Sequence, residues 1–356
     1  MANKLQVGIV GCGAVAAKRH IPGFLRLRNK VVFQAVCDRN EALARETAKR
    51  FAIPWAYPSL SEMLAQEKLD IVDICTPPQT HAAVAIEALE KGCHILLEKP
   101  MALTTADCDG MLSASQKHGK KLCIVHNVLF HPPLLKARKL VREGAIGEFT
   151  GMRILLSDPR AEMIMRKDYW IHKLPGGLIG ETGPHPVYIS LAFIGRVNSV
   201  EVYARRFLEH PWAPFDEFRI ELDGERGMSS VVVSYSSNRY EAGVDILGTE
   251  GALRLDLQGM LTIRQGAKTS LSPLSVVSSS LGSVSQTVEG LLGNSFKVAT
   301  GRFRLGHDTV IEMFVDSVLE DNPPPVTGEE GREVVRVMEM IVARLRQKYG
   351  LAQPTP

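Results

Sequence analysis

The stretch "LQVGIVGCGAVAAKRH", residues 5–20, constrains the fold of this chain more than any other segment. It places Gly11, Gly13 and Ala16 directly after an apolar, β-rich run and at the start of a helical pattern. In such a unit the first glycine permits a tight turn, the second lets the backbone approach a pyrophosphate, and a small third residue allows close helix–strand packing. The segment therefore predicts a dinucleotide-binding site, and a purely structural glycine turn is the alternative. The predicted contacts are Gly11, Gly13, Ala14, Val15 and Ala16.

Strands and helices alternate along the first third of the chain. This alternation is typical of βαβ units, and near-continuous apolar strands fit a parallel sheet that is covered on both faces. We therefore predict a doubly wound α/β Rossmann domain at residues 1–126. The predicted strands are 5–10, 31–37, 71–76, 94–99 and 121–126, and the predicted helices are 14–28, 40–51, 59–66, 80–91 and 104–117.

The pattern changes after residue 126. A helix is predicted first, and strands of alternating type joined by short turns follow it. Two amphipathic helices then close the chain. These features predict an α+β domain at residues 127–356 with a large, mostly antiparallel sheet. Its predicted helices are 132–144, 307–320 and 329–348, and its strands lie within 148–158, 199–207, 218–224, 228–237, 241–258 and 260–266.

Residues 266–300 fit neither pattern. They are rich in Ser, Gly and Val and nearly uncharged. An ordinary surface excursion is favoured there over a lid or a partner surface.

Composition limits the function classes. The chain has 356 residues, of which 45% are hydrophobic and 23% are charged, and its formal net charge is +3. Proteins that bind nucleic acid or membrane surfaces usually carry a concentrated basic excess, so neither partner is predicted. No window approaches the roughly 18 apolar residues of a membrane span. The start "MANKLQVGIVG" shows no charged-then-apolar leader, which predicts a cytoplasmic protein.

The 6 cysteines all lie in the first part of the chain, and none forms a C-x-x-C pair. Such spacing favours small buried side chains over a disulfide framework or a zinc site. No metal is therefore predicted.

Asp38 ends the second predicted strand. Its carboxylate is suited to accept hydrogen bonds from the adenosine ribose and would repel a 2′-phosphate, which favours NAD. Arg39 follows directly and is suited to bind that phosphate or to stack on adenine, which keeps NADP as the alternative cofactor.

The motifs "GCGAVA", "CDR", "TPPQTH", "EKP" and "GGLIGETGPH" occur in this order along the chain. Together they resemble the glucose–fructose oxidoreductase / inositol dehydrogenase / rhizopine catabolism (Gfo/Idh/MocA) family over most of the chain. The resemblance implies a Rossmann domain, then an α+β domain whose open sheet often forms oligomer contacts. A homo-oligomer, either a dimer or a tetramer, is therefore expected. The family commonly oxidises or reduces sugars, cyclitols or sugar nucleotides with NAD(P).

The "EKP" motif matches Glu98, Lys99 and Pro100, which end a predicted strand. Ligands of open α/β sheets bind at the carboxyl ends of strands. The resemblance implies that Glu98 and Lys99 lie at the cofactor and that Lys99 is a catalytic residue touching the substrate. An ammonium there stabilises an alkoxide as it develops during hydride transfer. A surface lysine is the alternative, and Pro100 is suited to a cis bond.

In "GGLIGETGPH" the resemblance implies that Glu181 and His185 are catalytic and bind the substrate. Imidazole is suited to move a proton near neutral pH, so His185 is the candidate general acid/base. A spacing of four would place both side chains on one face of a helical turn. Glu181 stands where the family usually has aspartate, and Pro184 and Pro186 disturb a regular helix. A structural histidine is the alternative.

The loop "TPPQTH", residues 76–81, resembles the family loop near the cofactor, which implies contacts from Thr76 and Pro77. His81 opens the next helix, and both a cofactor contact and a purely structural turn remain open for it. Asn127 matches a family position that faces cofactor and substrate. Leu129 stands where the family often has arginine, so substrate binding at this loop departs from the family.

The segment "DPRAEMIMRKDYWIHKLPGG", residues 158–177, helps to line the substrate pocket in the family. The implied substrate contacts are Arg160, Tyr169 and Trp170. Aromatic rings beside cations suit a sugar that carries a phosphate or carboxylate. An anionic sugar, such as a nucleotide sugar, is one interpretation, and a solvated basic loop is the other.

We therefore predict an NAD(P)-dependent oxidoreductase that acts on CH–OH groups. It transfers hydride between nicotinamide and a secondary alcohol or ketone of a sugar, a cyclitol or a sugar nucleotide. One rival is an NAD-dependent redox-assisted glycosidase of the same fold. The other is a non-enzymatic NAD(P)-binding sensor, which Glu181 and Leu129 favour and which Lys99 and His185 oppose.

Overall fold

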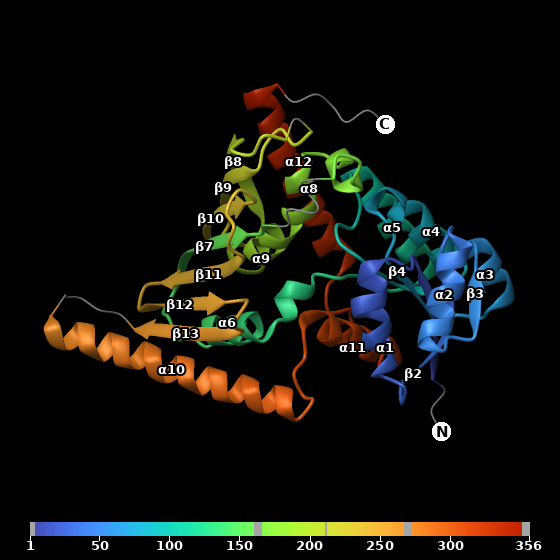
Figure 1. Ribbon diagram of the computed structural model, residues 1–356, viewed down its shortest axis with the longest axis horizontal. Coiled ribbons are helices and arrows are strands. Elements are labelled where there is room, and N and C mark those ends of the chain that lie inside the picture. Colours follow the sequence, from blue (N-terminus) through green and yellow to red (C-terminus); the bar gives the residue numbers. More distant parts are fainter. Residues whose placement is uncertain (1–3, 160–165, 211, 267–271, 351–356) are drawn as a thin grey trace. The chain divides into compact units, whose positions relative to one another are not determined.

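The computed structural model describes residues 4–159, 166–210, 212–266 and 272–350, and it divides into two compact units (Figure 1). Unit 1 comprises Met1–Asn127 and Leu305–Arg336, and unit 2 comprises Val128–Arg304 and Val337–Pro356. The first boundary lies beside the predicted one. The segment Leu305–Arg336, predicted in the second domain, instead belongs to unit 1.

Unit 1 contains a six-stranded sheet in the order β3-β2-β1-β4-β5-β6, and every pair in it is parallel. The strand order therefore reverses between β1 and β4, which is where open α/β sheets bind ligands. Five strands were predicted, whereas the three-residue edge strand β3 was missed. The strands are β1 Leu5–Val10, β2 Val31–Cys37, β3 Trp55–Tyr57, β4 Ile71–Ile74, β5 His94–Leu97 and β6 Leu122–Ile124.

The predicted helices of the first domain are present. Local signals set their ends: the side chain of Asn40 accepts from the Leu43 N–H at the start of α2, and Thr104 does the same for α5. The helix predicted at 14–28 contains a π-helical turn and ends at Leu25. The elements are η1 Ala16–His20, α1 Ile21–Leu25, α2 Glu41–Phe51, α3 Leu60–Gln66, η2 Pro78–Thr80, α4 His81–Glu90, α5 Thr105–His118 and η3 Asn127–Phe130.

Helix α11, Gly306–Leu319, joins unit 1 because it packs against α1 and η1. A Cβ at position 23 would lie 2.7 Å from Ile311 Cδ1, so the glycine in α1 permits close approach. Lys30 Nζ also donates to Asp316 at 2.7 Å. These contacts join residues almost 300 positions apart, which explains why the sequence pattern assigned the helix to the wrong unit.

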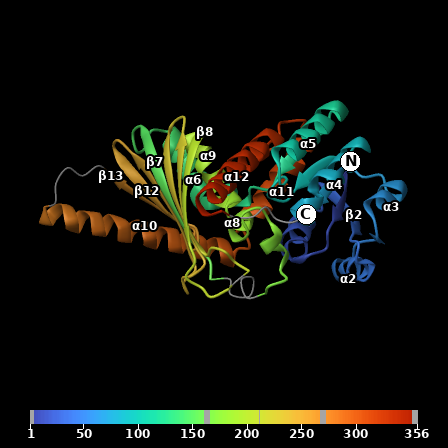
Figure 2. The same cartoon turned by 90° about the horizontal axis from the view of Figure 1, so that it is seen from above.

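Unit 2 contains a seven-stranded sheet in the order β13-β12-β11-β7-β10-β9-β8. Only the β7–β10 pair is parallel, so the predicted mostly antiparallel sheet is confirmed. Helices α6 and α9 pack on one side of it (Figure 2). The elements are α6 Pro132–Arg142, β7 Phe149–Ser157, η4 Trp170–Lys173, α8 Leu178–Thr182, α9 Pro184–Ile194, β8 Val197–Arg205, β9 Glu217–Gly224, β10 Gly227–Ser234, β11 Glu241–Gly248, β12 Gly251–Asp256 and β13 Leu261–Gly266.

Two further helices complete the described chain. Helix α12, Gly328–Tyr349, starts in unit 1 and ends in unit 2. The Ser-, Gly- and Val-rich segment 266–300, which fitted neither sequence pattern, contains α10, Pro273–Ala299. This helix has 27 residues and packs along β13. Its Ser272 cap accepts from the Ser275 N–H, although serine, glycine and valine favour helices weakly. Within the described residues, no helix combines the length and the apolar character needed to cross a membrane.

Candidate active site

The glycine loop after β1 has the shape that a bound phosphate requires. Gly11 has a φ of +95°, and a Cβ there would lie 2.8 Å from the Cys75 carbonyl, so only glycine fits. A Cβ at Gly13 would meet nothing within 4 Å, which leaves open space in front of the loop. Ala16 is fully buried behind it. The Ala17 N–H donates to the Gly13 carbonyl at 3.0 Å, so the helix starts at the motif.

Asp38 holds the end of β2 against this loop. Its Oδ2 accepts from the Cys12 N–H at 2.9 Å, and its Oδ1 accepts from the Asn40 N–H at 2.8 Å. The carboxylate is only partly buried, and Arg39 beside it is exposed. The residues present therefore fit an adenosine ribose next to the phosphate loop.

His20 is the centre of a buried charged network that the sequence did not reveal. Its ring is fully buried at the end of the π-helical turn. Nδ1 lies 2.9 Å from an Asp73 carboxylate oxygen, and Nε2 lies 2.9 Å from Glu98 Oε1. His307 Nε2 lies 3.5 Å from the same Glu98 oxygen. We call these four side chains the His20 network.

The network leads to the backbone of Lys99, because Glu98 Oε2 accepts from the Lys99 N–H at 3.0 Å. Two features of the sequence from which no prediction was drawn are compatible with this network: an aspartate in the apolar strand "IVDI" and a histidine just after the glycine motif. A buried charge needs a partner, so an aspartate at a core position predicts a nearby cation. The partner itself is distant in sequence.

Electrostatics favour one imidazolium in the His20 network. Burial alone would lower the pKa of His20, but the negative charge of Asp73 raises it well above its ordinary value. Burial alone would raise the pKa of Glu98, yet hydrogen bonds from His20 and His307 lower it well below its ordinary value. Burial raises the pKa of Asp73, and His20 opposes that shift. A protonated His20 between two acids follows from this arrangement.

The same side chains have the composition of a metal site. His20, Glu98 and His307 bring ligand-type atoms within 4.8 Å of one another. Both ring nitrogens of His20 already face carboxylates at hydrogen-bonding distance, so hydrogen bonding accounts for the cluster. We assign no metal to it.

Lys99 follows β5 and is half-buried, while Glu98 before it is buried. The Lys99–Pro100 peptide bond is cis, which confirms the option raised from the sequence. His81 fastens this turn to the loop after β4, since Nδ1 lies 2.9 Å from the Pro100 carbonyl and Nε2 lies 2.8 Å from the Thr76 carbonyl. Burial lowers the pKa of His81, and hydrogen bonding to the two carbonyls opposes that shift, because only the protonated ring can donate to both.

The predicted cofactor residues of unit 1 gather at one edge of its sheet. Gly11, Asp38, Thr76, Lys99 and Asn127 each follow the end of a strand or lie a few residues beyond it. The strands are parallel, so these ends share one edge. Pro77 is exposed there, whereas His81 and the Glu98 carboxylate are buried.

In unit 2, His185 lies in the first turn of α9. Its Nδ1 lies 2.6 Å from the Tyr188 hydroxyl, which also accepts from the Val128 N–H at 3.2 Å. When Nδ1–H donates to Tyr188, the lone pair lies on Nε2, and the ring can take a proton there. Tyr188 was missed, although it lies three positions after His185, a spacing that places two side chains on one face wherever the segment is helical.

The helical turn expected to link Glu181 and His185 is interrupted. Helix α8 ends at Thr182 and α9 begins at Pro184, because prolines 184 and 186 have no N–H to donate. Gly183 between them keeps helical angles, with φ −54° and ψ −35°. The Glu181 carboxylate accepts from the Thr182 hydroxyl at 2.9 Å.

The predicted substrate loop is only partly described, and Arg160 lies outside the described residues. The ring centres of Tyr169 and Trp170 lie 6.0 Å apart, and the Arg166 guanidinium carbon lies 5.5 Å from the Tyr169 ring centre. A cation on an aromatic face is therefore present. Leu129, at the position where the family often has arginine, is 8% exposed, so that position is part of the core.

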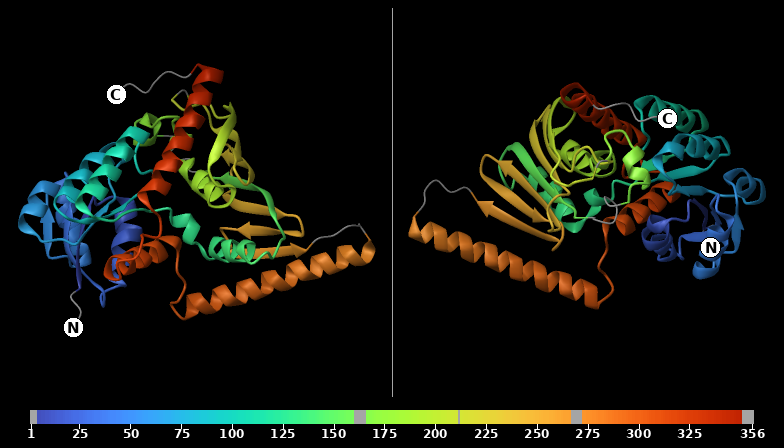
Figure 3. Two further views of the ribbon diagram at one scale, coloured as in Figure 1. Left: turned by 180° about the vertical axis from the view of Figure 1, so that it is seen from behind. Right: turned by 45° about the horizontal axis from the view of Figure 1, so that its top comes forward.

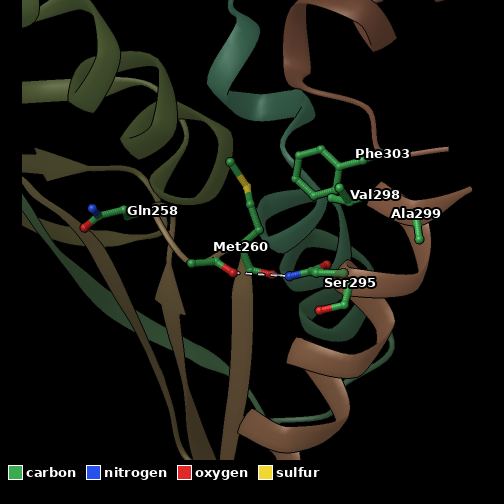
Figure 4. A pocket seen from close by; sticks show the side chains of 8 residues that line it. Gln258, Met260, Ser295, Val298, Ala299 and Phe303 are labelled. Atoms are coloured by element: carbon green, nitrogen blue, oxygen red, sulfur yellow. Dashed lines mark hydrogen bonds between the residues drawn. The ribbon is translucent and has the colours of Figure 1, made fainter. Parts of the chain in front are cut away.

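A pocket of about 420 Å³ lies elsewhere in unit 2, between the β12–β13 turn and the end of α10 (Figure 4). No residue predicted for catalysis or binding lines it. Its lining carries no charged side chain, so we do not assign the substrate to it. The lining residues are Gln258, Gly259, Met260, Asn294, Ser295, Val298, Ala299 and Phe303.

Two regions of the chain match known protein families, one in each unit. Residues 5–126 match the family described as "Oxidoreductase family, NAD-binding Rossmann fold", and residues 134–254 match the "GFO/IDH/MocA C-terminal domain". The chain belongs to the Gfo/Idh/MocA oxidoreductase family. Its first unit is thus an NAD-binding Rossmann domain, as predicted.

Relatives of this Gfo/Idh/MocA protein include named sugar dehydrogenases and reductases. A D-apiose dehydrogenase of Paraburkholderia graminis is 27% identical over 275 residues, which is 75% of this chain and 72% of that protein. The dTDP-3,4-didehydro-2,6-dideoxy-alpha-D-glucose 3-reductase of Streptomyces violaceoruber is 28% identical, over 71% of this chain and 72% of that protein. This chain is accordingly an NAD(P)-dependent dehydrogenase.

A solved structure agrees on the fold. The WlbA dehydrogenase of Bordetella pertussis, in complex with NADH and UDP-GlcNAcA, has a TM-score of 0.78 and covers 99% of each chain. Its sequence identity of 21% limits the comparison to the fold.

Proposed function

We propose that this enzyme transfers hydride between NAD and a secondary alcohol or ketone of a sugar, a cyclitol or a sugar nucleotide. The observation that supports this most is the placement of Lys99. It lies at the strand-end edge that also carries the glycine loop and Asp38, and the His20 network anchors its backbone. The sugar-acting relatives support the same substrate class.

The residues have distinct roles in this proposal. When bound, the nicotinamide accepts or supplies the hydride. In the oxidative direction His185 takes the hydroxyl proton at Nε2, with Tyr188 orienting its ring. The Lys99 ammonium stabilises the alkoxide as it develops. Glu181, held by Thr182, binds a substrate hydroxyl.

The proposed cofactor contacts divide into three groups. The pyrophosphate would be held by Gly11, Gly13, Ala14 and Val15, with the buried Ala16 packed behind them. The adenosine ribose would be held by Asp38 with Arg39, and the nicotinamide half by Thr76, Pro77, Lys99 and Asn127. Glu98 and His81 are buried, and their side chains are hydrogen-bonded to other residues of the protein. We therefore propose that they position the cofactor loops and do not touch the cofactor themselves.

An anionic sugar is the finer proposal for the substrate. Arg166 on the face of Tyr169, with Trp170 beside it, offers both an aromatic surface and a cation. Turnover of neutral cyclitols with no turnover of sugar acids or nucleotide sugars would contradict it.

A screen of the purified protein tests the function. We expect absorbance at 340 nm to change when NAD⁺ is supplied with one class among sugars, cyclitols and nucleotide sugars. Product analysis should show a ketone, with one NADH formed for each molecule oxidised. Tightly held NAD with glycoside cleavage and no net NADH would indicate the redox-assisted glycosidase, and binding without any turnover would indicate a sensor.

Asp38→Ala is expected to raise the Kd for NADH about 10- to 100-fold, because a charged acceptor of ribose hydrogen bonds is worth about 1.5–3 kcal/mol. The Kd for NADPH should change less, since the variant also removes repulsion of the 2′-phosphate. Fluorescence titration measures both constants. Arg39→Ala is the matched change on the neighbouring residue, and it should weaken NADPH more than NADH. An Asp38→Ala variant that binds NADH as the wild type does would refute the assignment.

A further inference from the structure

Helix α10 lies along β13, one of the two edge strands of the unit 2 sheet (Figure 3). The side chain of Gln286 forms hydrogen bonds to the backbone of β13 in the way that a neighbouring strand would. Its Oε1 accepts from the Arg264 N–H at 2.9 Å, and its Nε2 donates to the Arg264 carbonyl at 3.0 Å. Asn294 Nδ2 donates to the Met260 carbonyl at 3.1 Å. Polar side chains thus attach α10 to the sheet, because an edge strand presents unpaired backbone groups.

The apolar side of α10 consequently faces away from the sheet, except at the end of the helix, where Val298 also lines the pocket beside the β12–β13 turn. None of its residues is buried. Seven apolar side chains follow a 3-4 spacing along the helix, and each is 48–83% exposed. We call them the α10 seam: Leu274, Val277, Leu281, Val284, Val288, Leu291 and Val298.

This spacing is the heptad pattern of a coiled coil, in which apolar residues alternate three and four positions apart. Ser295 occupies the single heptad position of the series that is not apolar. The positions that flank a coiled-coil contact carry serine, threonine, asparagine, proline, alanine and leucine. Glu289 and Lys297 are the charged residues of α10, and both lie outside the seam and its flanks. No charge therefore opposes a second helix here.

The exposed area is large for a monomer. Seven side chains at this exposure, with Leu292 beside them, present roughly 800 Å² of apolar surface, whereas the largest apolar patch of a typical monomer is about 300–600 Å². A standard protein–protein interface buries about 800 Å² on each partner. The seam together with Leu292 thus presents about the area that one side of a stable dimer buries.

We propose that α10 pairs with α10 of a second copy of this chain along the α10 seam. The series is self-complementary about its centre: in an antiparallel pair Leu281 faces Leu291 and Val284 faces Val288 of the other copy, as two-fold symmetry requires. A membrane surface fits less well, because helices that lie in membranes carry Lys and Arg beside the apolar face. This contact is independent of the proposed chemistry and gives the expected homo-oligomer a specific interface.

The mass of the full-length protein in solution tests the proposal. We expect a self-associated wild type, and we expect Leu281→Glu/Leu291→Glu to halve its mass in size-exclusion chromatography with light scattering. The matched control is Val276→Glu/Phe296→Glu, which adds the same charges to α10 away from the seam and should keep the wild-type mass. Circular dichroism and NADH binding should be unchanged in both variants, because the altered side chains are exposed.

Cross-linking adds a second, positive test. Leu281→Cys/Leu291→Cys should form disulfide-linked dimers on mild oxidation, in either helix orientation. The two positions lie about 15 Å apart on one helix, too far for an internal bond. The natural cysteines are all buried, and Val276→Cys/Phe296→Cys should not cross-link. A monomeric wild type overturns the proposal, as does a Glu variant of unchanged mass. A monomer that sediments with phosphatidylglycerol vesicles through the seam would assign α10 to membranes instead.

Discussion

Lys99→Met is expected to lower kcat by about 10²- to 10³-fold, since removal of one group that stabilises a developing oxyanion costs about 2.7–4 kcal/mol of transition-state stabilisation. The Kd for NADH should stay nearly constant, because the glycine loop and Asp38 hold the other half of the cofactor. Methionine keeps the unbranched side chain of lysine and removes the charge. Steady-state kinetics at 340 nm and fluorescence titration measure the two quantities.

Lys91→Met provides the matched control for this change. Lys91 is exposed after α4 in the same unit and belongs to no predicted site, so kcat should not change. If both lysine variants retain full activity, Lys99 is a surface lysine and the proposed mechanism fails.

Asp73→Asn is expected to lower the free energy of unfolding by about 3 kcal/mol, because it leaves the buried His20 imidazolium with one acid fewer. The change keeps the shape of the side chain and so leaves no cavity. Urea unfolding measures the loss. Asp109→Asn breaks an exposed ion pair with Arg332 in the same unit, and it should change the urea midpoint little.

The pH dependence of this loss has a definite sign. The pKa of His20 is raised well above 6.5, so its contribution to stability is complete below pH 6.5 and is lost as the pH rises through the raised value. The pKa of Glu98 is lowered well below 4.5, so its contribution is present above pH 4.5 and is lost on acidification. The difference in stability between wild type and Asp73→Asn should therefore be larger at pH 6 than at pH 9.

A double-mutant cycle with His20→Gln separates the interaction from each residue's own effect. The double variant should lose less unfolding free energy than the two single variants lose together. Each single variant leaves one charged side chain without its partner, whereas the double variant removes both charges. Simple additivity would mean that the two side chains are not coupled.

The Glu98 carboxylate accepts a hydrogen bond from the Lys99 N–H and so holds the backbone of that residue. Glu98→Gln should therefore lower kcat more than it raises KM.

The Rossmann unit could be predicted from the sequence because its signals are local. The glycine motif, the apolar strands and the alternating helices each occupy fewer than about 20 consecutive residues, and their order implies a parallel sheet. Asp38 and Lys99 could be identified for the same reason, because each lies at the end of a recognisable strand. Asp38 directly follows β2, and Lys99 lies two positions after the last residue of β5. The catalytic roles of Lys99 and His185 rest on the family motifs and remain predictions.

Only the tertiary structure brought together the His20 network, because its members are distant in the chain. His20 lies 53 positions from Asp73 and 78 from Glu98, and no local pattern connects residues at such separations. Helix α11 was placed in the wrong unit for the same reason.

The sequence by itself determined the cofactor unit, the mostly antiparallel second sheet and the family. Only the tertiary structure decided which way α10 faces. A helix with an apolar stripe is expected to turn that stripe inward. Here the edge of β13 presents backbone groups that only polar side chains can pair, so Gln286 and Asn294 face the sheet and the apolar seam faces outward.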